Sequence, residues 1–390
     1  MLKKCRICNN QFLSFLSLGM QPCADTFLGS KEKALNLKRF PLIVGYCKCS
    51  HLSSLYPITG YQRYEKYDYS YTSDNSIVSR THFKKIANFI CRKFRLNKKS
   101  FVVEAGSNDG TFLSEIVHLS QAKVLGVDPS KNITNIARKK KIKTITNYFN
   151  NKIAKKVLNK FGTADVIYGA NVFNHVDNIS DFLKGANILL NKKGNLILEV
   201  PDLNSLIEKI GFDTIYHEHR HYFSENSIYK VLKMEGFYVN KIQKINYMSG
   251  SLRVFASKIK RKKKYPNLRK ISLKEFNFFK KKVHYIIDKV KDFVKKNESV
   301  IGVGAATKGN TLINCCQFTD KDIKNIIDRS KYKINKFTPG SAIKIIKETK
   351  TIKANAALIL PWNITKYLVK KKFFRKIKYI SIQKIIKNIK

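Results

Sequence analysis

The chain has 390 residues, of which 43% are hydrophobic and 26% are charged, and its formal net charge is +49. A chain of this length is expected to form two or three domains, and its hydrophobic content argues against wholesale disorder. It contains no run of 18 apolar residues and no signal-peptide core at its N-terminus. We therefore predict a cytoplasmic protein with no membrane partner.

The charge alone favours a nucleic-acid-binding protein, but its distribution weakens that interpretation. Lysines are scattered through every segment, often beside Ile and Asn, as expected from an AT-rich coding sequence. A basic surface attracts any polyanion weakly, because phosphate neutralisation needs only lysines. An anionic small substrate would benefit from the same field.

Residues 1–60 carry two close cysteine pairs, Cys5-x-x-Cys8 and Cys47-x-Cys49. Four thiolates complete a tetrahedral zinc and leave no open position, so we predict a structural zinc site in this module. The second pair is tighter than the usual spacing, which leaves His51 open as a substitute ligand. Unrelated buried cysteines are the alternative, and buried small residues are what we expect of Cys23, Cys91, Cys315 and Cys316.

After a tyrosine-rich start, residues 61–258 alternate between strand and helix signals. A buried strand is predicted at 101–104, followed by a glycine turn, a helix and a second strand at 124–128. Further strands are predicted at 165–172 and 194–201. A strand–turn–helix–strand unit that ends on an aspartate is typical of parallel-sheet nucleotide folds, and this order matches class I methyltransferases.

The turn at 104–110 reads Glu-Ala-Gly-Ser-Asn-Asp-Gly and lacks the full dinucleotide fingerprint. Its acidic side chains would repel a pyrophosphate but suit the sulfonium and amino groups of S-adenosylmethionine. An aspartate at the end of the second strand is placed to accept hydrogen bonds from ribose hydroxyls. The alternative is that these are mere strand-end polar residues. We predict S-adenosylmethionine as the cofactor, bound by Glu104, Gly106, Asn108, Asp109, Gly110, Asp128 and Asn171.

The segment Tyr216–Ser224 packs three histidines and a glutamate into nine residues. If the segment is extended, His217, His219 and His221 share one face. A metal site and a polar surface loop are the alternatives. We favour acid–base chemistry by a histidine that titrates near neutral pH, supported by a glutamate and a tyrosine.

A long amphipathic helix is predicted at 273–296, and a second strand–helix alternation follows it. Strands at 299–303 and 326–328 flank a glycine turn at 304–309. This pseudo-repeat predicts a second Rossmann-like domain, although two unrelated α/β domains remain the alternative. The expected α/β architecture is a zinc-binding module at 1–60, a class I methyltransferase domain at 61–258 and a C-terminal Rossmann-like substrate-binding domain at 259–390.

Taken together, these motifs resemble the sugar C-methyltransferase family, which methylates a ring carbon of nucleotide-linked deoxysugars. The chain departs from the family pattern at its tightened second cysteine pair and at Met248–Ser251, where the family more often has a glycine pair. The stretches that carry the resemblance are Cys5–Cys8, Cys47–Cys49, Tyr69–Ser73, Val103–Gly110, Asn171–Val176, Tyr216–Ser224, Ser249–Val254, Gly304–Leu312, Asp328–Ser330, Pro339–Gly340 and Pro361–Asn363.

The resemblance implies that a base removes a proton next to a sugar ketone and that the carbanion attacks the sulfonium methyl group. It makes His219 the base, with the sugar pocket lined by Tyr216, Glu218, His175 and Tyr71. Tyr69 is an alternative to Tyr71. The C-terminal domain would help to hold the nucleotide sugar, with Lys308 near its phosphates and Arg253 also binding substrate. The family tendency is a monomer.

A zinc-containing RNA-binding methyltransferase that uses its basic surface is the alternative function. A histidine base is needed for carbon methylation but not for gripping phosphates, so the His-Glu-His segment favours the sugar enzyme. A non-catalytic binding subunit is disfavoured because His219 and the loop carboxylates are present. The nucleotide, the sugar and the methylated carbon stay open.

Overall fold

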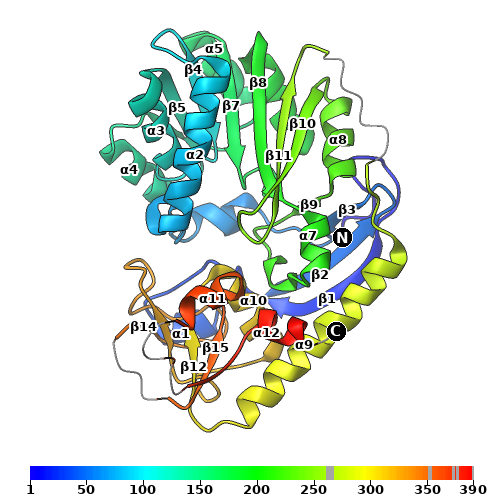
Figure 1. Ribbon diagram of the computed structural model, residues 1–390, viewed down its shortest axis with the longest axis vertical. Coiled ribbons are helices and arrows are strands. Elements are labelled where there is room, and N and C mark those ends of the chain that lie inside the picture. Colours follow the sequence, from blue (N-terminus) through cyan, green and yellow to red (C-terminus); the bar gives the residue numbers. More distant parts are fainter. Residues whose placement is uncertain (261–267, 350–353, 371–373, 375–376, 389–390) are drawn as a thin grey trace.

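In the computed structural model three β-sheets and their helices build the molecule (Figure 1). The structure describes residues 1–260, 268–349, 354–370, 374 and 377–388. None of the helices in these ranges is both long and apolar enough to cross a bilayer. The methyltransferase sheet and the C-terminal sheet lie at opposite ends of the view, and the N-terminal sheet lies between them.

The N-terminal sheet is antiparallel, in the order β1-β2-β3-β9. Its members are β1 (Leu13–Gln21), β2 (Phe40–Cys47), β3 (His51–Ser54) and β9 (His221–Phe223), with the short helix α1 (Lys31–Leu35) between the first two. Strand β9 comes from the histidine-rich segment, about 170 residues further along the chain than β3. The predicted zinc-binding module and the predicted chemistry segment therefore share one sheet.

The central sheet has seven strands in the order β10-β11-β8-β7-β4-β5-β6. The strands β4 to β8 run parallel, and β11 lies antiparallel between β8 and β10. This is the class I methyltransferase order, as the sequence predicts. The strands are β4 (Phe101–Ala105), β5 (Lys123–Asp128), β6 (Thr144–Thr146), β7 (Ala164–Ala170), β8 (Leu190–Pro201), β10 (Tyr238–Ile245) and β11 (Ser251–Ser257).

Helices cover both faces of this sheet because its strands are apolar on both sides. Val102 packs with α2, α3 and α4, whereas its neighbour Val103 points to the opposite face and packs with α5, α6 and α8. The helices are α2 (Ile77–Phe94), α3 (Thr111–Ser120), α4 (Lys131–Lys139), α5 (Asn151–Phe161), α6 (Ile179–Leu189) and α8 (Glu225–Met234). Helix α7 (Leu203–Glu208) instead packs in the core that joins the other two sheets.

The C-terminal sheet is parallel throughout, in the order β14-β13-β12-β15-β16. This confirms the predicted second Rossmann-like unit. Its strands are β12 (Val300–Val303), β13 (Ile326–Asp328), β14 (Ile345–Lys347), β15 (Ala356–Ile359) and β16 (Lys378–Ile380), and its helices are α10 (Thr307–Cys316), α11 (Thr365–Leu368) and α12 (Ile382–Lys387).

The long helix α9 (Leu273–Lys295) joins the N-terminal and C-terminal sheets through one hydrophobic core. It begins at a capping box in which Ser272 and Glu275 bind each other's backbone N–H groups. Phe276 packs against Tyr46 and Phe15 of the N-terminal sheet, with ring centroids 4.5 and 5.2 Å away. The same cluster includes residues of β1 and β2 from the N-terminal sheet, of β12 and β15 from the C-terminal sheet, and of α10 and α12.

Candidate active site

A cavity of about 840 Å³ opens between the methyltransferase sheet and the C-terminal sheet. It lies beyond the carboxyl ends of the parallel strands of both sheets, where open α/β folds bind ligands. Of the predicted site residues, those that line it are Tyr71, Glu104, Gly106, Asn108, Asp128, Asn171, His175, Tyr216, Glu218, His219 and Lys308, and Tyr69 lines it as well. The cavity therefore brings most of the predicted site together from three regions of the chain.

The turn after β4 requires glycine at Gly106. Its φ is +67°, and a Cβ there would come within 2.7 Å of a methyl group of Val172. Any larger residue would be strained and would push into the neighbouring loop. The main chain can therefore pass close to a ligand at this point.

Two buried carboxylates face the cavity from this turn and from the end of β5. Glu104 is 3% exposed, and one of its oxygens has no hydrogen-bond partner among the described residues. Asp128 accepts from the backbone N–H groups of Ser130 and Asn108 at 2.9 and 3.0 Å. Burial raises the pKa of Glu104 well above its usual value and raises that of Asp128 to about 6. An unpaired buried carboxylate fits a cationic ligand, and the amino and sulfonium groups of S-adenosylmethionine meet that requirement.

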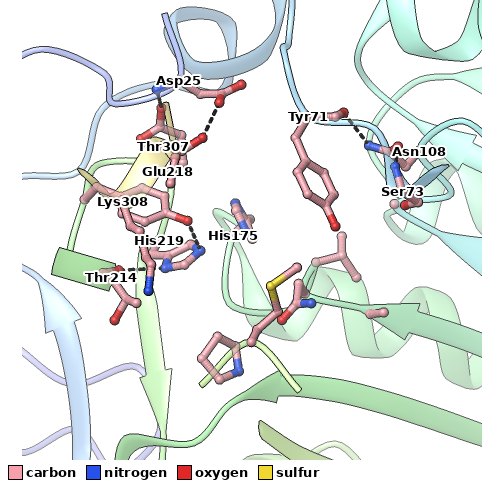
Figure 2. Close-up of a pocket in the computed structure, with 18 of the residues that line it drawn as sticks. Asp25, Tyr71, Ser73, Asn108, His175, Thr214, Glu218, His219, Thr307 and Lys308 are labelled. Atoms are coloured by element: carbon pink, nitrogen blue, oxygen red, sulfur yellow. Dashed lines mark hydrogen bonds between the residues drawn. The ribbon is translucent and has the colours of Figure 1, made fainter. Parts of the chain in front are cut away.

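A further predicted cofactor residue, Asn108, holds the loop in place. Asn108 accepts from the backbone N–H of Ser73 at 2.8 Å and donates to the carbonyl oxygen of Tyr71 at 3.1 Å (Figure 2). It thereby attaches the tyrosine-rich segment to the turn.

Asp109 does not line the cavity. It accepts from Thr111 and Lys140, while Gly110 caps α3 in the left-handed region with a φ of +75°. Asp109 also accepts from the backbone N–H of Asp74 at 3.1 Å, so it connects the segment before α2 to the start of α3.

Both ring nitrogens of His219 are hydrogen-bonded (Figure 2). Nδ1 lies 2.8 Å from the carbonyl oxygen of Thr214, and Nε2 lies 2.8 Å from the hydroxyl of Tyr216. Since a carbonyl oxygen only accepts, Nδ1 carries the proton and Nε2 presents its lone pair. Burial lowers the pKa of His219 to about 4, which keeps the ring neutral at physiological pH.

His175 stands edge-on to His219, with ring centroids 4.8 Å apart and planes at 89°. Its Nδ1 bonds the hydroxyl of Tyr64, and Arg63 donates to its carbonyl oxygen at 2.8 Å. Burial lowers its pKa well below the usual value, so this ring is neutral as well. Tyr71 lies on the other side of the cavity in Figure 2, with His175 between it and His219.

Glu218 binds the N-terminal module. Its carboxylate accepts from the backbone N–H groups of Asp25 and Ala24 at 2.9 and 3.3 Å, and burial raises its pKa to about 7. Asp25 in turn accepts from Ser70 and from the hydroxyl of Thr307. All three parts of the chain thus meet at Asp25, which the sequence analysis missed because no local motif marks it.

The three histidines do not share a face, so that expectation is wrong. Residues 216–219 form a turn, with the N–H of His219 bonded to the carbonyl oxygen of Tyr216. His217 turns to the carbonyl oxygens of Gln21 and Phe40, and His221 turns to His51. Side chains alternate between the two faces of a strand only from β9 onward, and His219, which lines the cavity, precedes that strand.

The two predicted substrate-binding cations differ in position. Lys308 lines the cavity, with its ammonium 4.2 Å from the ring centre of Trp362 and 3.9 Å from a carboxylate oxygen of Asp213. Arg253 does not line it. Its guanidinium lies on β11 and pairs with buried Glu199 at 2.6 Å, which corrects the assignment of this residue to the substrate site.

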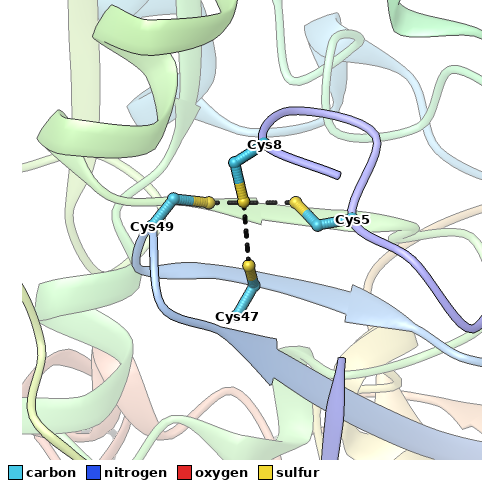
Figure 3. A group of neighbouring side chains, drawn as sticks. All are labelled: Cys5, Cys8, Cys47 and Cys49. Atoms are coloured by element: carbon cyan, nitrogen blue, oxygen red, sulfur yellow. Dashed lines mark hydrogen bonds between the residues drawn. The ribbon is translucent and has the colours of Figure 1, made fainter. Parts of the chain in front are cut away.

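The four cysteine thiols of the N-terminal module come together, with all four sulfurs within 4.8 Å of one another (Figure 3). The pair Cys5–Cys49 is 3.8 Å apart and the pair Cys8–Cys47 is 3.1 Å apart. Sulfurs about 2.3 Å from one tetrahedral zinc would be about 3.8 Å apart, so the donor set fits that ion. Only one residue separates Cys47 from Cys49 because the chain turns there from β2 into β3. The ring of His51 is directed elsewhere, with its Nε2 3.3 Å from Nδ1 of His221.

Comparison with known proteins agrees with this arrangement. Three family models match in succession: a zinc binding domain at residues 5–58, a methyltransferase domain at 78–242 and a C-methyltransferase C-terminal domain at 247–379. The C-methyltransferase NovU of Streptomyces niveus is 29% identical over 361 residues, which cover 88% of this chain and 85% of NovU.

Solved structures resemble one part of the chain. Magnesium protoporphyrin IX methyltransferase from Synechocystis PCC 6803 covers 46% of this chain and 79% of its own, with a TM-score of 0.36 and 16% identity. A methyltransferase from Clostridium acetobutylicum covers 46% of this chain and 91% of its own, with a TM-score of 0.37 and 13% identity. In its three successive domain matches, its cysteine cluster and its sheet order, the chain is similar to S-adenosylmethionine-dependent C-methyltransferases that carry an N-terminal zinc-binding domain.

Proposed function

We propose that this C-methyltransferase acts on a nucleoside-diphosphate-linked keto-deoxysugar and methylates the carbon next to its ketone. The observation that carries the proposal is the neutral His219, which lines the cavity together with Glu104 and Asp128 and has an unprotonated Nε2 that accepts from the hydroxyl of Tyr216. A carbon beside a ketone becomes nucleophilic only after it loses a proton, so the reaction needs a base of this kind.

In the proposed mechanism Nε2 of His219 removes the proton from the sugar carbon. The charge that forms on the ring is stabilised by the carbonyl oxygen of Thr214, which accepts from Nδ1. The hydroxyl of Tyr216 donates to the same Nε2 lone pair, so in this mechanism it turns to the sugar ketone when the substrate binds and donates to the oxygen that gains charge. S-adenosylmethionine, when bound, supplies an electrophilic methyl group to the carbanion.

The cofactor residues act by charge and shape. Glu104 and Asp128 hold the cationic and ribose ends of the ligand, and Gly106 lets the backbone approach it. Asn171 closes the same wall from the end of β7. Asp109 and Gly110 act indirectly, because they keep the turn in its conformation.

The nucleotide is proposed to lie against the C-terminal domain, with Lys308 near its phosphates. The cavity volume is near the upper end of the range for ligand pockets, as expected for two ligands that must meet. Burial lowers the pKa of Lys308, whereas the negative charge of Asp213 acts to raise it. A bound phosphate would add a second anionic partner to this ammonium. We also propose that the boundaries between the zinc-binding module, the methyltransferase domain and the C-terminal domain lie at residues 60 and 258.

An RNA methyltransferase is the weaker proposal. The matched family and NovU are C-methyltransferases, and the base His219 is buried inside the cavity beside His175 and Tyr216. The zinc site has no part in the chemistry that we propose, because four thiolates leave no open coordination position.

The proposal is tested with a panel of nucleotide-linked keto-deoxysugars and a cofactor labelled in its methyl group. We expect label on a ring carbon next to the ketone, located by NMR of the product. Label on oxygen or nitrogen, or transfer to RNA but to none of the sugars, would contradict it.

A further inference from the structure

The two Rossmann-like units of this chain share the same turn after their first strand. Gly106 follows β4 with a φ of +67°, and Gly304 follows β12 with a φ of +81°. Each donates its N–H to the last residues of the neighbouring strand, Gly106 to Val127 at 2.7 Å and Gly304 to Ile327 at 2.8 Å. A Cβ on Gly304 would meet Pro361 at 2.6 Å, as one on Gly106 would meet Val172.

The likeness extends to the aspartate at the end of the second strand. Asp328 accepts from the N–H of Ser330 at 2.7 Å and from that of Ala305 at 2.6 Å. Asp128 likewise accepts from the residue two places on and from the loop after the first strand. Both carboxylates line the same cavity. In the first unit this aspartate has the position that binds the ribose hydroxyls of a nucleoside.

The charges around the two turns differ in one informative way. Two residues before the turn glycine, the first unit has Glu104, whereas the second has Gly302. The second unit instead has Lys308 in the first turn of α10, at the positive end of the helix. The second site therefore lacks the carboxylate that suits a cation and gains a group that suits a phosphate.

A further polar group is available beside Asp328. Ser330 is 6% exposed and lines the cavity, and its hydroxyl has no hydrogen-bond partner among the described residues. Buried hydroxyls are normally paired, so this one points to a ligand that supplies the partner. The unpaired hydroxyl of Ser330 is an observation separate from the geometry of the glycine turn and from the N-terminus of α10.

We infer that Asp328, assisted by Ser330, binds the 2′- and 3′-hydroxyls of the substrate's nucleoside, and that the enzyme uses a ribonucleoside diphosphate sugar. The inference rests on the proposed function and makes its substrate class narrower. Each carboxylate oxygen of Asp328 has room for one further donor besides its backbone N–H. A ribose diol supplies two donors, whereas a 2′-deoxyribose supplies one.

The test compares nucleoside diphosphates that differ in one oxygen. The full-length protein, saturated with S-adenosylhomocysteine to block the cofactor site, is titrated with UDP, CDP, GDP and ADP and with their 2′-deoxy forms. For the base that binds best, we expect the 2′-deoxy form to bind about tenfold more weakly or worse, because it loses a hydrogen bond to a charged group. Equal or tighter binding of the 2′-deoxy form overturns the inference and leaves the proposed function intact.

If none of the nucleoside diphosphates binds while S-adenosylhomocysteine does, the inference and the nucleotide-sugar proposal both fail. Asp328→Asn should bring the ribose-to-deoxyribose affinity ratio close to one, and Asp128→Asn should leave that ratio unchanged while weakening the cofactor. A folded Asp328→Asn protein that keeps the wild-type ratio overturns the role of Asp328. If the Asp328→Asn protein does not fold, the inference is tested by the ribose-to-deoxyribose affinity ratio of the wild-type protein alone.

Discussion

The Nδ1 atom of His219 lies 2.8 Å from the carbonyl oxygen of Thr214. This contact fixes the tautomer that a general base requires, with the lone pair on Nε2, where it accepts from the hydroxyl of Tyr216. It also connects the base to the short helical turn Phe212–Thr214, which carries the buried Asp213. Asp213 accepts from the indole N–H of Trp362 in the C-terminal domain at 2.7 Å. The base is therefore positioned partly by the domain that we propose to hold the nucleotide.

The first prediction concerns the pH dependence of proton removal. Burial lowers the pKa of His219 to about 4, so the neutral, active form persists below the usual titration range of histidine. The rate of hydrogen exchange at the sugar carbon should fall as the pH falls through about 4, not through 6.5. Short pH-jump measurements in deuterated buffer would locate this acid limb. A midpoint near 6.5 would show that another group, or a solvated histidine, acts as the base.

The second prediction concerns Glu104. Glu104→Gln keeps the shape of the side chain but removes the charge that we propose to pair with the cofactor cation. S-adenosylmethionine should bind about 10- to 100-fold more weakly, as for the loss of a charge-assisted hydrogen bond. Glu115→Gln, a substitution on α3 outside the cavity lining, is the matched control and should bind normally.

The same carboxylates predict how cofactor affinity depends on pH. Burial raises the pKa of Asp128 to about 6 and raises that of Glu104 well above its usual value, so the empty site takes up protons as the pH falls through about 6. A cationic ligand favours their ionised forms, so affinity should rise with pH through about 6, with protons released on binding. Calorimetry in buffers of different ionisation enthalpy measures this release. Proton uptake on binding would contradict the assignment.

The third prediction concerns zinc. Strand β3 begins two residues after Cys49 and pairs with β9, which begins two residues after His219. Cys8→Ser, or chelation, should therefore remove amide protection from both strands and lower turnover by roughly 100-fold, because the base is misplaced. Cofactor affinity should change little, since the β4 turn lies in another sheet. The buried Cys23, outside the cluster, provides the control variant Cys23→Ser. Unchanged hydrogen exchange in β9 after metal loss would refute this coupling.

Much of the fold was predictable because its signals are local. The strand–glycine–helix units at β4 and β12 each place an apolar run before a turn that only glycine tolerates, and both occur where the sequence predicts. The cysteine spacing likewise predicts a cluster that the structure brings together. By contrast, β8 begins at Leu190, four residues before the predicted start, in a polar stretch that carries no strand signal.

The parts of the site that the sequence did not predict depend on contacts between distant segments. Asp25 lines the cavity because Glu218 and Thr307 hold it there, and nothing near residue 25 records this. Arg253 was misassigned because a strand arginine that pairs with Glu199 looks, in sequence, like one that faces a ligand. The histidine pattern failed because the chain turns at 216–219 before it becomes extended at β9.

The most direct test of the central claim is hydrogen exchange at the sugar carbon, measured with a methyl-free cofactor analogue in deuterated water. Wild-type protein with S-adenosylhomocysteine and the accepted keto-sugar should exchange the proton next to the ketone. In His219→Asn, whose amide can still donate to Thr214, exchange should fall by about 100-fold or more, while cofactor affinity is kept. His217→Asn, in the same segment but bonded to backbone carbonyls away from the cavity, should still exchange. Undiminished exchange in a folded His219→Asn protein would contradict the account.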